Sequence, residues 1–220
     1  MFVGHLGAGL AAEAVNRRVN LGVLFGAAML LAAVLWVLVL AGLERMNIPA
    51  DHAARHYLTF SFPYSHSLLG AVLWGGGAAL VWRAFARGAG AWAGGVIVAL
   101  TVISHWVLDA LAHAPELSPW GGDAPLIGLD LWDHQPWALV VEFAVAIAGL
   151  ALYWRHARPR PWRGLGVAAL VAVAGVFTPL GAFSTQPPPG VLPIASTSLV
   201  IIVIFTLLAG FADRTQGSAP

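Results

Sequence analysis

The sequence predicts an all-α polytopic integral membrane protein, a helical bundle of six transmembrane helices plus one short N-terminal helix. Of its 220 residues, 59% are hydrophobic and only 10% are charged, and the mean hydropathy is +0.80. Soluble domains contain about 45–50% apolar and about 25% charged residues. The composition therefore excludes a soluble globular domain. It also excludes a disordered chain, which would need low hydrophobicity and high charge.

Six apolar runs are long enough to cross a bilayer. A helix rises about 1.5 Å per residue, so about 20 apolar residues cross a hydrocarbon core of about 30 Å. The expected spans are residues 21–43, 66–86, 91–113, 135–154, 164–183 and 193–211. A shorter helical stretch, residues 3–15, precedes them. Because this stretch is only about 20 Å long, we expect a re-entrant or partly buried helix packed on the bundle.

The arginines indicate the orientation of the bundle. If all six spans cross the membrane, nine of the eleven arginines lie on one face: Arg17, Arg18, Arg83, Arg87, Arg155, Arg158, Arg160, Arg163 and Arg214. The opposite face receives only Arg45 and Arg55. Because basic residues are enriched in cytoplasmic loops, we expect the arginine-rich face and the C-terminus in the cytoplasm. Loops 44–65 and 114–134 are then expected outside.

The remaining composition narrows the chemistry. The chain has no cysteine, which excludes disulfide bonds and thiolate metal ligands. Its formal net charge is +1, so nothing indicates a nucleic-acid partner, and membrane lipids are the expected partners. We expect a single domain, residues 1–220, in which residues 1–155 carry the candidate site and residues 164–212 form two scaffold helices.

Ionisable side chains within apolar segments are the candidate functional residues, because burying them in a membrane is costly unless they are paired, hydrated or metal-bound. Seven lie within or at the edge of these segments: His5, Glu13, His66, His105, Asp109, His113 and Glu142. Counting the rise of each helix from its end places His5, His66, His105, Asp109 and Glu142 in the outer half of the membrane. We expect Glu13 to pair with Arg17, and His113 to be solvated.

His105 and Asp109 form the most specific pair. Their i, i+4 spacing places both side chains on one patch of a helix. An imidazole and a carboxylate in this arrangement can hold a divalent cation such as zinc. The same pair could instead orient a proton acceptor or brace two helices. The spacing alone leaves these three interpretations open.

The other candidates differ in their surroundings. His66 follows a proline and Ser65, a candidate helix N-cap, so it is expected at the outer start of its helix. His5 lies between glycines that allow close helix contact. Glu142 is a carboxylate without an obvious partner inside a span, and it must be protonated, paired or bound to another group.

These residues carry a family resemblance. His5, the stretch PYSHSLL around His66, and the stretch SHWVLDAL with His105 and Asp109 resemble the membrane-bound metal-dependent hydrolases of bacteria. The stretches HAPELSPWGG and GLDLW, together with Glu142, resemble one branch of that group. The resemblance covers roughly residues 1–155. It implies a distant relation to zinc-dependent phospholipase C and P1 nuclease, which are all-helical zinc proteins, and an inner-membrane location.

The resemblance implies a divalent metal ion, Zn²⁺ by analogy, held by His5, His66, His105 and Asp109. Members of the family often carry an acidic residue near the start of the second helical segment, whereas residues 21–43 contain none. This departure favours a single metal ion, or a site without metal, over a cluster of several ions.

The leading hypothesis is a metal-dependent hydrolase that acts on a lipid-like or phosphoester substrate from the outer half of the membrane. Asp109 would be a fourth ligand or a base, and Glu142 a general base or a residue that orients the ligands. One alternative is a small transporter or channel in which the same residues bind a cation or relay protons. Another is a non-catalytic protein that organises the membrane.

Overall fold

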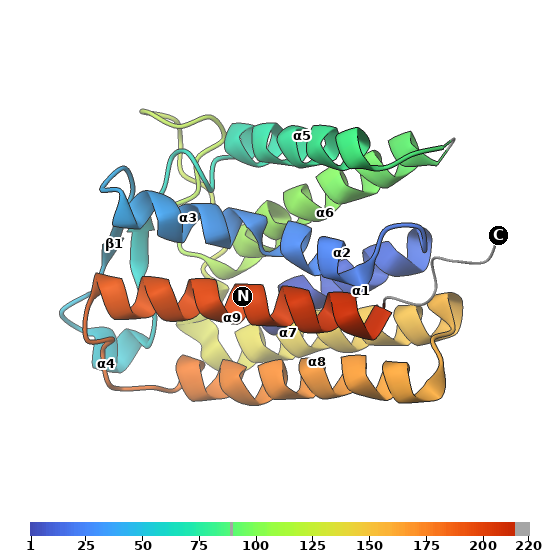
Figure 1. Ribbon diagram of the computed structural model, residues 1–220. Coiled ribbons are helices and arrows are strands. Elements are labelled where there is room, and N and C mark those ends of the chain that lie inside the picture. Colours follow the sequence, from blue (N-terminus) through green and yellow to red (C-terminus); the bar gives the residue numbers. More distant parts are fainter. Residues whose placement is uncertain (89, 214–220) are drawn as a thin grey trace.

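The computed structural model describes residues 1–88 and 90–213 as a mostly helical bundle whose helices run roughly alongside one another (Figure 1). The helices of the described residues are α1 (Val3–Val15), α2 (Leu21–Ala28), α3 (Leu30–Leu40), α4 (His52–Arg55), α5 (Leu68–Phe85), α6 (Ala91–Ala112), α7 (Gln135–Leu152), α8 (Pro161–Ala182) and α9 (Val191–Asp213). A 3-10 turn (Leu131–His134) precedes α7, and a π-helical turn (Tyr153–Ala157) follows it.

The helices confirm a multi-span helical protein. Among the described residues, five helical segments are long and apolar enough to cross a membrane, or six if the bent pair α2 and α3 is one span. The expected single helix over residues 21–43 is broken, because α2 ends at Ala28, α3 begins at Leu30, and their axes differ by 50°. Met29 links the two helices in a non-helical conformation.

Close contact between α1 and α7 fixes the N-terminal helix inside the bundle. A side chain on Gly7 would place its Cβ 2.5 Å from the carbonyl oxygen of Val145, and one on Gly149 would overlap the backbone of Gly7. Only glycine lets the two backbones approach this closely. Leu6 and Leu10 of α1 are fully buried in the apolar core. The expectation that small residues around His5 allow close helix packing is confirmed.

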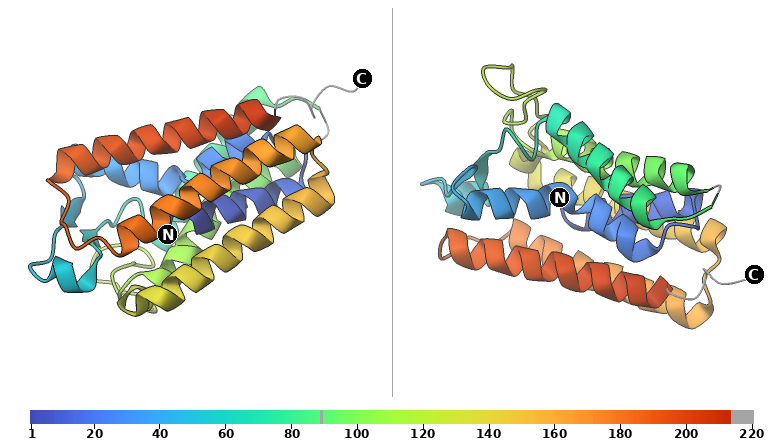
Figure 2. Two further views of the ribbon diagram at one scale, coloured as in Figure 1. Left: turned by 90° about the horizontal axis from the view of Figure 1, so that it is seen from below. Right: turned by 45° about the horizontal axis from the view of Figure 1, so that its top comes forward.

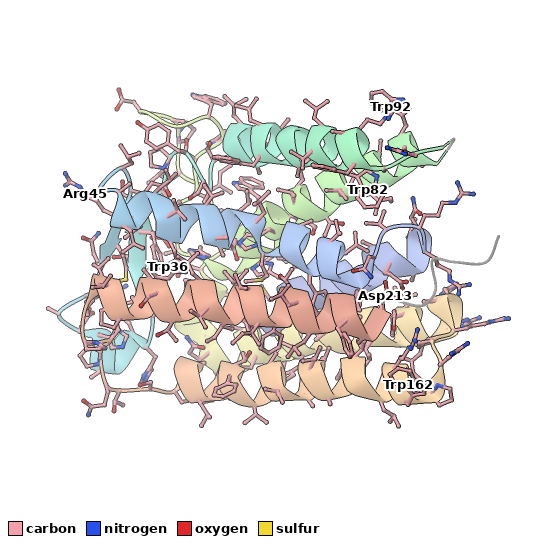
Figure 3. The ribbon with its side chains drawn as sticks, viewed as in Figure 1. Trp36, Arg45, Trp82, Trp92, Trp162 and Asp213 are labelled. Carbon is pink, nitrogen blue, oxygen red and sulfur yellow. The ribbon has the colours of Figure 1, made fainter. Side chains whose placement is uncertain are left out.

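The two ends of the bundle differ. At one end, here called the loop end, β1 (Arg45–Asn47) pairs antiparallel with β2 (Thr59–Ser61), and α4 lies beside them (Figure 1). The opposite end, here called the arginine end, carries Trp162 and Asp213, whereas Arg45 lies at the loop end (Figure 3). Arg214 and the C-terminus, both of which entered the orientation expected from sequence, lie outside the described residues.

Candidate metal centre

Four histidines and one aspartate meet inside the bundle. This histidine cluster consists of His5 on α1, His66 just before α5, His105 and Asp109 on α6, and His113 just after α6. All five side chains are buried. Asp109 is central: its Oδ1 lies 3.1 Å from Nε2 of His5, and its Oδ2 lies 3.1 Å from Nε2 of His105, 3.4 Å from that of His66 and 3.8 Å from that of His113. The four residues expected as metal ligands are therefore brought together.

Backbone geometry at the bend in α2 and α3 orients His105. The last carbonyl groups of a helix have no partner within that helix. The bend leaves the carbonyl of Ala28, the last residue of α2, 2.6 Å from Nδ1 of His105. A carbonyl oxygen can only accept, so Nδ1 of His105 carries the hydrogen and donates it. Nε2 of His105 is therefore left with its lone pair, and it faces Asp109.

Two hydrogen-bonded side chains, those of Glu44 and Ser65, orient His66 in the same way. Oγ of Ser65 donates to Oε2 of Glu44 over 2.7 Å, and Oε1 of Glu44 accepts the backbone N–H groups of Tyr64 and Ser65. Because the Ser65 hydroxyl hydrogen is used, its oxygen can only accept from Nδ1 of His66, 2.8 Å away. Nε2 of His66 then also has a free lone pair. Partners of this kind fix the ring and tautomer of histidines that bind metals.

The prediction that Ser65 caps α5 is wrong. The helix begins at Leu68, and the N-cap is Ser67, whose side chain accepts from the N–H of Gly70 over 3.0 Å. Glu44, the first residue of the expected external loop 44–65, is buried and belongs to the support of His66. Burial raises the pKa of Glu44 above its ordinary value, although its hydrogen bonds to Ser65 and Tyr64 partly oppose this.

The structure also places His113 differently from the sequence prediction, which was that this side chain is solvated. It is buried rather than solvated, because the loop after α6 folds back and its Glu116 accepts from Nδ1 of His113 over 2.5 Å. The other oxygen of Glu116 accepts from the N–H of Phe60 on β2. The available sequence signal was a second i, i+4 step, from Asp109 to His113.

The distances within the cluster fit a metal ion. Nε2 of His66 lies 3.3 Å from Nε2 of His105, and each nitrogen carries a lone pair, so the two repel unless a metal ion or a proton lies between them. In a tetrahedral site with bonds of about 2.0–2.1 Å to zinc, ligand atoms lie about 3.3 Å apart. Ligand atoms of His5, His105 and Asp109 all lie within 4.8 Å of one another, and this buried group could hold a metal ion. The amino group of Met1 lies 3.4 Å from Oδ1 of Asp109.

His5 is held by the packing of its helix. Its ring stacks on that of His105, with centroids 3.7 Å apart and planes within 6°, and its Nδ1 has no hydrogen-bond partner among the described residues. Oε1 of Glu142 accepts the backbone N–H groups of Phe2 and Gly4, so it caps the start of the helix that carries His5. The structure thus gives Glu142 a partner, while its catalytic role stays a prediction.

The histidine cluster lies at the polar end of an apolar cavity. The cavity has a volume of about 550 Å³, and Glu142 shares it with all five members of the cluster. Its apolar walls include residues of α3, α7, α8 and α9, so the last two helices, expected as scaffold, contribute lining side chains such as Phe177 and Phe205. Trp36, on α3, also lines the cavity.

A second group of buried polar residues lies near the arginine end and is here called the acidic cluster; it consists of Glu13, Tyr153, Arg163 and Asp213. Neither carboxylate oxygen of Glu13 has a hydrogen-bond partner among the described residues. The expected partner, Arg17, attracts the Glu13 carboxylate electrostatically, whereas the carboxylate of Asp213 repels it. Oδ2 of Asp213 accepts from the N–H of Leu21 over 2.8 Å and so caps the start of α2.

Comparison with known protein families, with curated proteins and with solved structures finds no match to this chain.

Proposed function

We propose that the protein is a membrane-embedded metal-dependent hydrolase that acts on a lipid-like phosphoester from the outer half of the membrane. The observation that carries this proposal is the pair of nitrogen lone pairs, on His66 and His105, that face each other across 3.3 Å beside Asp109. Their other ring nitrogens are both held by acceptors, so the two rings are oriented to bind a cation.

Zinc is the proposed metal, with His5, His66, His105 and Asp109 as its ligands. Imidazole nitrogens and a carboxylate are typical zinc ligands, and the chain has no thiolate to offer. A bound zinc ion would lower the pKa of a coordinated water to about 7 and so supply a nucleophile at neutral pH. The hydrolytic reaction itself is supported by the resemblance of the motifs around His66 and His105 to bacterial membrane-bound hydrolases.

Side chains of the cavity supply the proton transfers. In phosphoester hydrolysis the oxygen of water binds to phosphorus, one P–O bond breaks, one proton leaves the water and another reaches the departing oxygen. Glu142 lines the cavity, and its Oε2 has no hydrogen-bond partner among the described residues, so it is the proposed acceptor of the first proton. His113, oriented by Glu116, is the proposed donor of the second.

The location follows from the sequence and from the cavity. The excess of arginines at the opposite end supports a loop end outside the cytoplasm. Residues of the loop end such as His56, Tyr57 and Trp132 line the same cavity as the histidine cluster, so the site would be open on that side. The cavity walls are mainly apolar, as a substrate with a hydrocarbon part requires.

A proton relay for transport is the second candidate, and one observation favours it. The 3.3 Å between Nε2 of His66 and Nε2 of His105 also fits a hydrogen bond through a shared proton. A relay across the membrane would need a polar path from this pair to Glu13. Among the described residues, the cavity lining does not include Glu13, and the buried side chains of Leu6 and Leu10 lie between the two regions on α1. This arrangement favours the hydrolase.

Elemental mass spectrometry of the purified protein tests the proposal. We expect about one zinc per chain in the wild type, and its loss in His105→Ala and Asp109→Ala. Ser104→Ala is the matched control, because Ser104 is on the same helix and, within residues 1–88 and 90–213, its hydroxyl donates to the carbonyl of Thr101 and not to the histidine cluster. Zinc-loaded wild type should then hydrolyse phosphodiesters. If no metal is retained even after zinc has been supplied and the excess removed, the metal-dependent mechanism is wrong.

A further inference from the structure

The cavity of the candidate site has two chemically different parts. The histidine cluster forms its polar part, and side chains from α3, α7, α8 and α9 form an apolar part that extends away from it. The apolar walls include Leu35, Leu139, Phe177, Ile202 and Phe205. A ligand that fills the whole cavity therefore needs one polar, metal-binding group and one hydrocarbon segment.

The apolar part reaches the surface of the bundle beside α8. Phe177 lines the cavity although 62% of its surface is exposed, and Gly181, one turn further along α8, lines the cavity and is also exposed. Ile201 of α9 lines the cavity and is 37% exposed. These residues belong to two helices that are apolar enough to span a membrane, so the opening faces hydrocarbon when the bundle is embedded.

The packing of α8 explains why the opening lies at this place. Figure 2 shows α8 between α7 and α9. At Gly175 a side chain would have its Cβ 3.0 Å from the ring of Phe143, so α8 touches α7 there. At Gly181, near the end of α8 that leads to the loop end, an added Cβ would meet no atom within 4 Å. The wall is closed at Gly175 and open at Gly181.

The cavity of the candidate site borders a second cavity at the loop end. His56, Trp132 and Gln135 line this cavity and also a neighbouring one of about 530 Å³ at the loop end. The neighbouring cavity contains the ion pair of Asp51 and Arg55, whose nitrogen and oxygen lie 2.8 Å apart. This neighbouring cavity is the route on which a polar fragment released at the histidine cluster would reach water, away from the opening beside α8.

We infer that the substrate is a single-chain phosphoester amphiphile that enters sideways from the bilayer, past Phe177 and Gly181. Its hydrocarbon chain lies against α8 and α9, and its phosphoester group lies at the histidine cluster, where an anionic group meets the imidazoles and the metal. The polar fragment leaves past His56 and Trp132. This inference rests on the proposed hydrolase function for the reaction, but the chain-binding part can be tested without it.

Photolabelling tests where the hydrocarbon chain binds. The probe is dodecylphosphonate with a diazirine at the end of its chain, applied to the full-length protein in lipid nanodiscs, with labelled residues mapped by mass spectrometry. We expect label on residues of α8 and α9 that line the cavity, and at least a tenfold loss of this label in Gly181→Trp. Gly166→Trp is the matched control, because Gly166 is also on α8 with no atom within 4 Å of an added Cβ, but does not line the cavity.

The same two variants separate the outcomes. With dodecyl 4-nitrophenyl phosphate as substrate, Gly181→Trp should lower kcat/KM at least tenfold, and with methyl 4-nitrophenyl phosphate it should leave kcat/KM unchanged.

Label spread evenly over the lipid-facing surface, or equal hydrolysis of both esters by both variants, overturns the inference and leaves the hydrolase intact. Label confined to α8 and α9 in a protein that hydrolyses neither ester overturns the hydrolase and supports the chain-binding cavity. Retained zinc in Gly181→Trp shows that the variant has folded.

Discussion

The histidine cluster and the acidic cluster are two groups of buried polar residues that each take one member from the short helix α1, His5 and Glu13, and they are built differently. In the histidine cluster, Nδ1 of His66, His105 and His113 each has a hydrogen-bond acceptor outside the cluster. In the acidic cluster, both oxygens of Glu13, Nε of Arg163 and one oxygen of Asp213 have no partner among the described residues. The two clusters lie towards opposite ends of the bundle.

This difference indicates different roles. Supporting hydrogen bonds hold one side of the imidazoles of His66, His105 and His113 and leave the other side free to bind a ligand, as in metal sites. Among the described residues, the side-chain hydrogen bonds of the acidic cluster are the two that Oδ2 of Asp213 accepts at the start of α2, from the N–H of Leu21 and from the side-chain amide of Asn20. We therefore expect the histidine cluster to dominate metal binding and activity, and the acidic cluster to affect only how the helices hold together.

Removing the metal is expected to give the largest effect on stability. At a free zinc concentration of about 1,000 times the dissociation constant, a ligand that binds only the folded state adds about 4 kcal/mol to the free energy of unfolding. A chelator should therefore lower the melting temperature of the wild type markedly. It should not change that of Asp109→Asn, which lacks the central carboxylate. Thermal unfolding followed by circular dichroism measures both.

A variant of the acidic cluster provides the contrast for this experiment. Glu13→Gln should respond to the chelator as the wild type does, because none of the described metal-ligand distances involves Glu13. If the chelator shifts Asp109→Asn and the wild type equally, the metal is bound elsewhere. If Glu13→Gln loses its response, the two clusters are not independent.

A wedge between α1 and α7 should disturb the histidine cluster through the backbone. Gly149→Val would force its side chain into the backbone of Gly7, and such overpacking costs about 1–3 kcal/mol. Since Gly7 is two residues from His5, zinc content should fall as well. Gly166→Val, where an added side chain meets open space, is the control for valine in a helix. Equal melting temperatures of the two variants would contradict the close contact.

The series of hydrogen bonds from Glu44 through Ser65 to His66 can be changed by a substitution that creates no cavity. In Glu44→Gln the amide would donate to Oγ of Ser65, which frees the Ser65 hydroxyl to donate to Nδ1 of His66. The hydrogen of His66 would then move to Nε2 and block its lone pair. Changes of this kind weaken metal binding about 10–100-fold. Competition with a fluorescent zinc chelator measures the change, and Asp51→Asn, at an exposed ion pair, should leave the affinity unchanged.

The same substitution makes a prediction about pH. Burial raises the pKa of Glu44 in the folded protein above the value of 4.5 expected for the unfolded chain. The protonated form therefore stabilises the fold, and this contribution is complete below pH 4.5 and is lost as the pH rises through the folded pKa. In metal-free protein, the unfolding free energy of the wild type should fall relative to that of Glu44→Gln over this window. A constant difference would contradict the raised pKa.

Particular elements show what could be predicted from the sequence. The apolar spans, and the similar depth of His5, His66, His105 and Asp109, could be predicted from hydropathy and helical rise. That these four side chains meet was implied only by the family resemblance, because depth along a helix does not give the rotation of that helix. The bend at Met29 could not, because residues 21–40 contain no proline, and the partner of the Ala28 carbonyl at the bend is a histidine far away in the sequence.

The parts missed lie where loops fold back onto the bundle. Glu44 and Glu116 support His66 and His113 only because the β1–β2 hairpin and the segment after α6 close over the loop end. Glu44 has no helical spacing to His66, and Glu116, although it is three residues after His113, lies beyond the end of α6. Depth in the membrane can be counted along one helix, but contacts between a loop and a span depend on the tertiary fold.

The smallest effect is expected at Glu13, and it tests the comparison most directly. A buried carboxylate without hydrogen bonds costs stability, so replacing it by a neutral side chain of the same shape should be neutral or slightly stabilising. Glu13→Gln should change the free energy of unfolding by less than about 1 kcal/mol. Asp213→Asn should be more destabilising, by about 1 kcal/mol, because it weakens the cap on Leu21. If Glu13→Gln instead destabilises the fold more than Asp213→Asn does, Glu13 has a partner that makes the acidic cluster as organised as the histidine cluster.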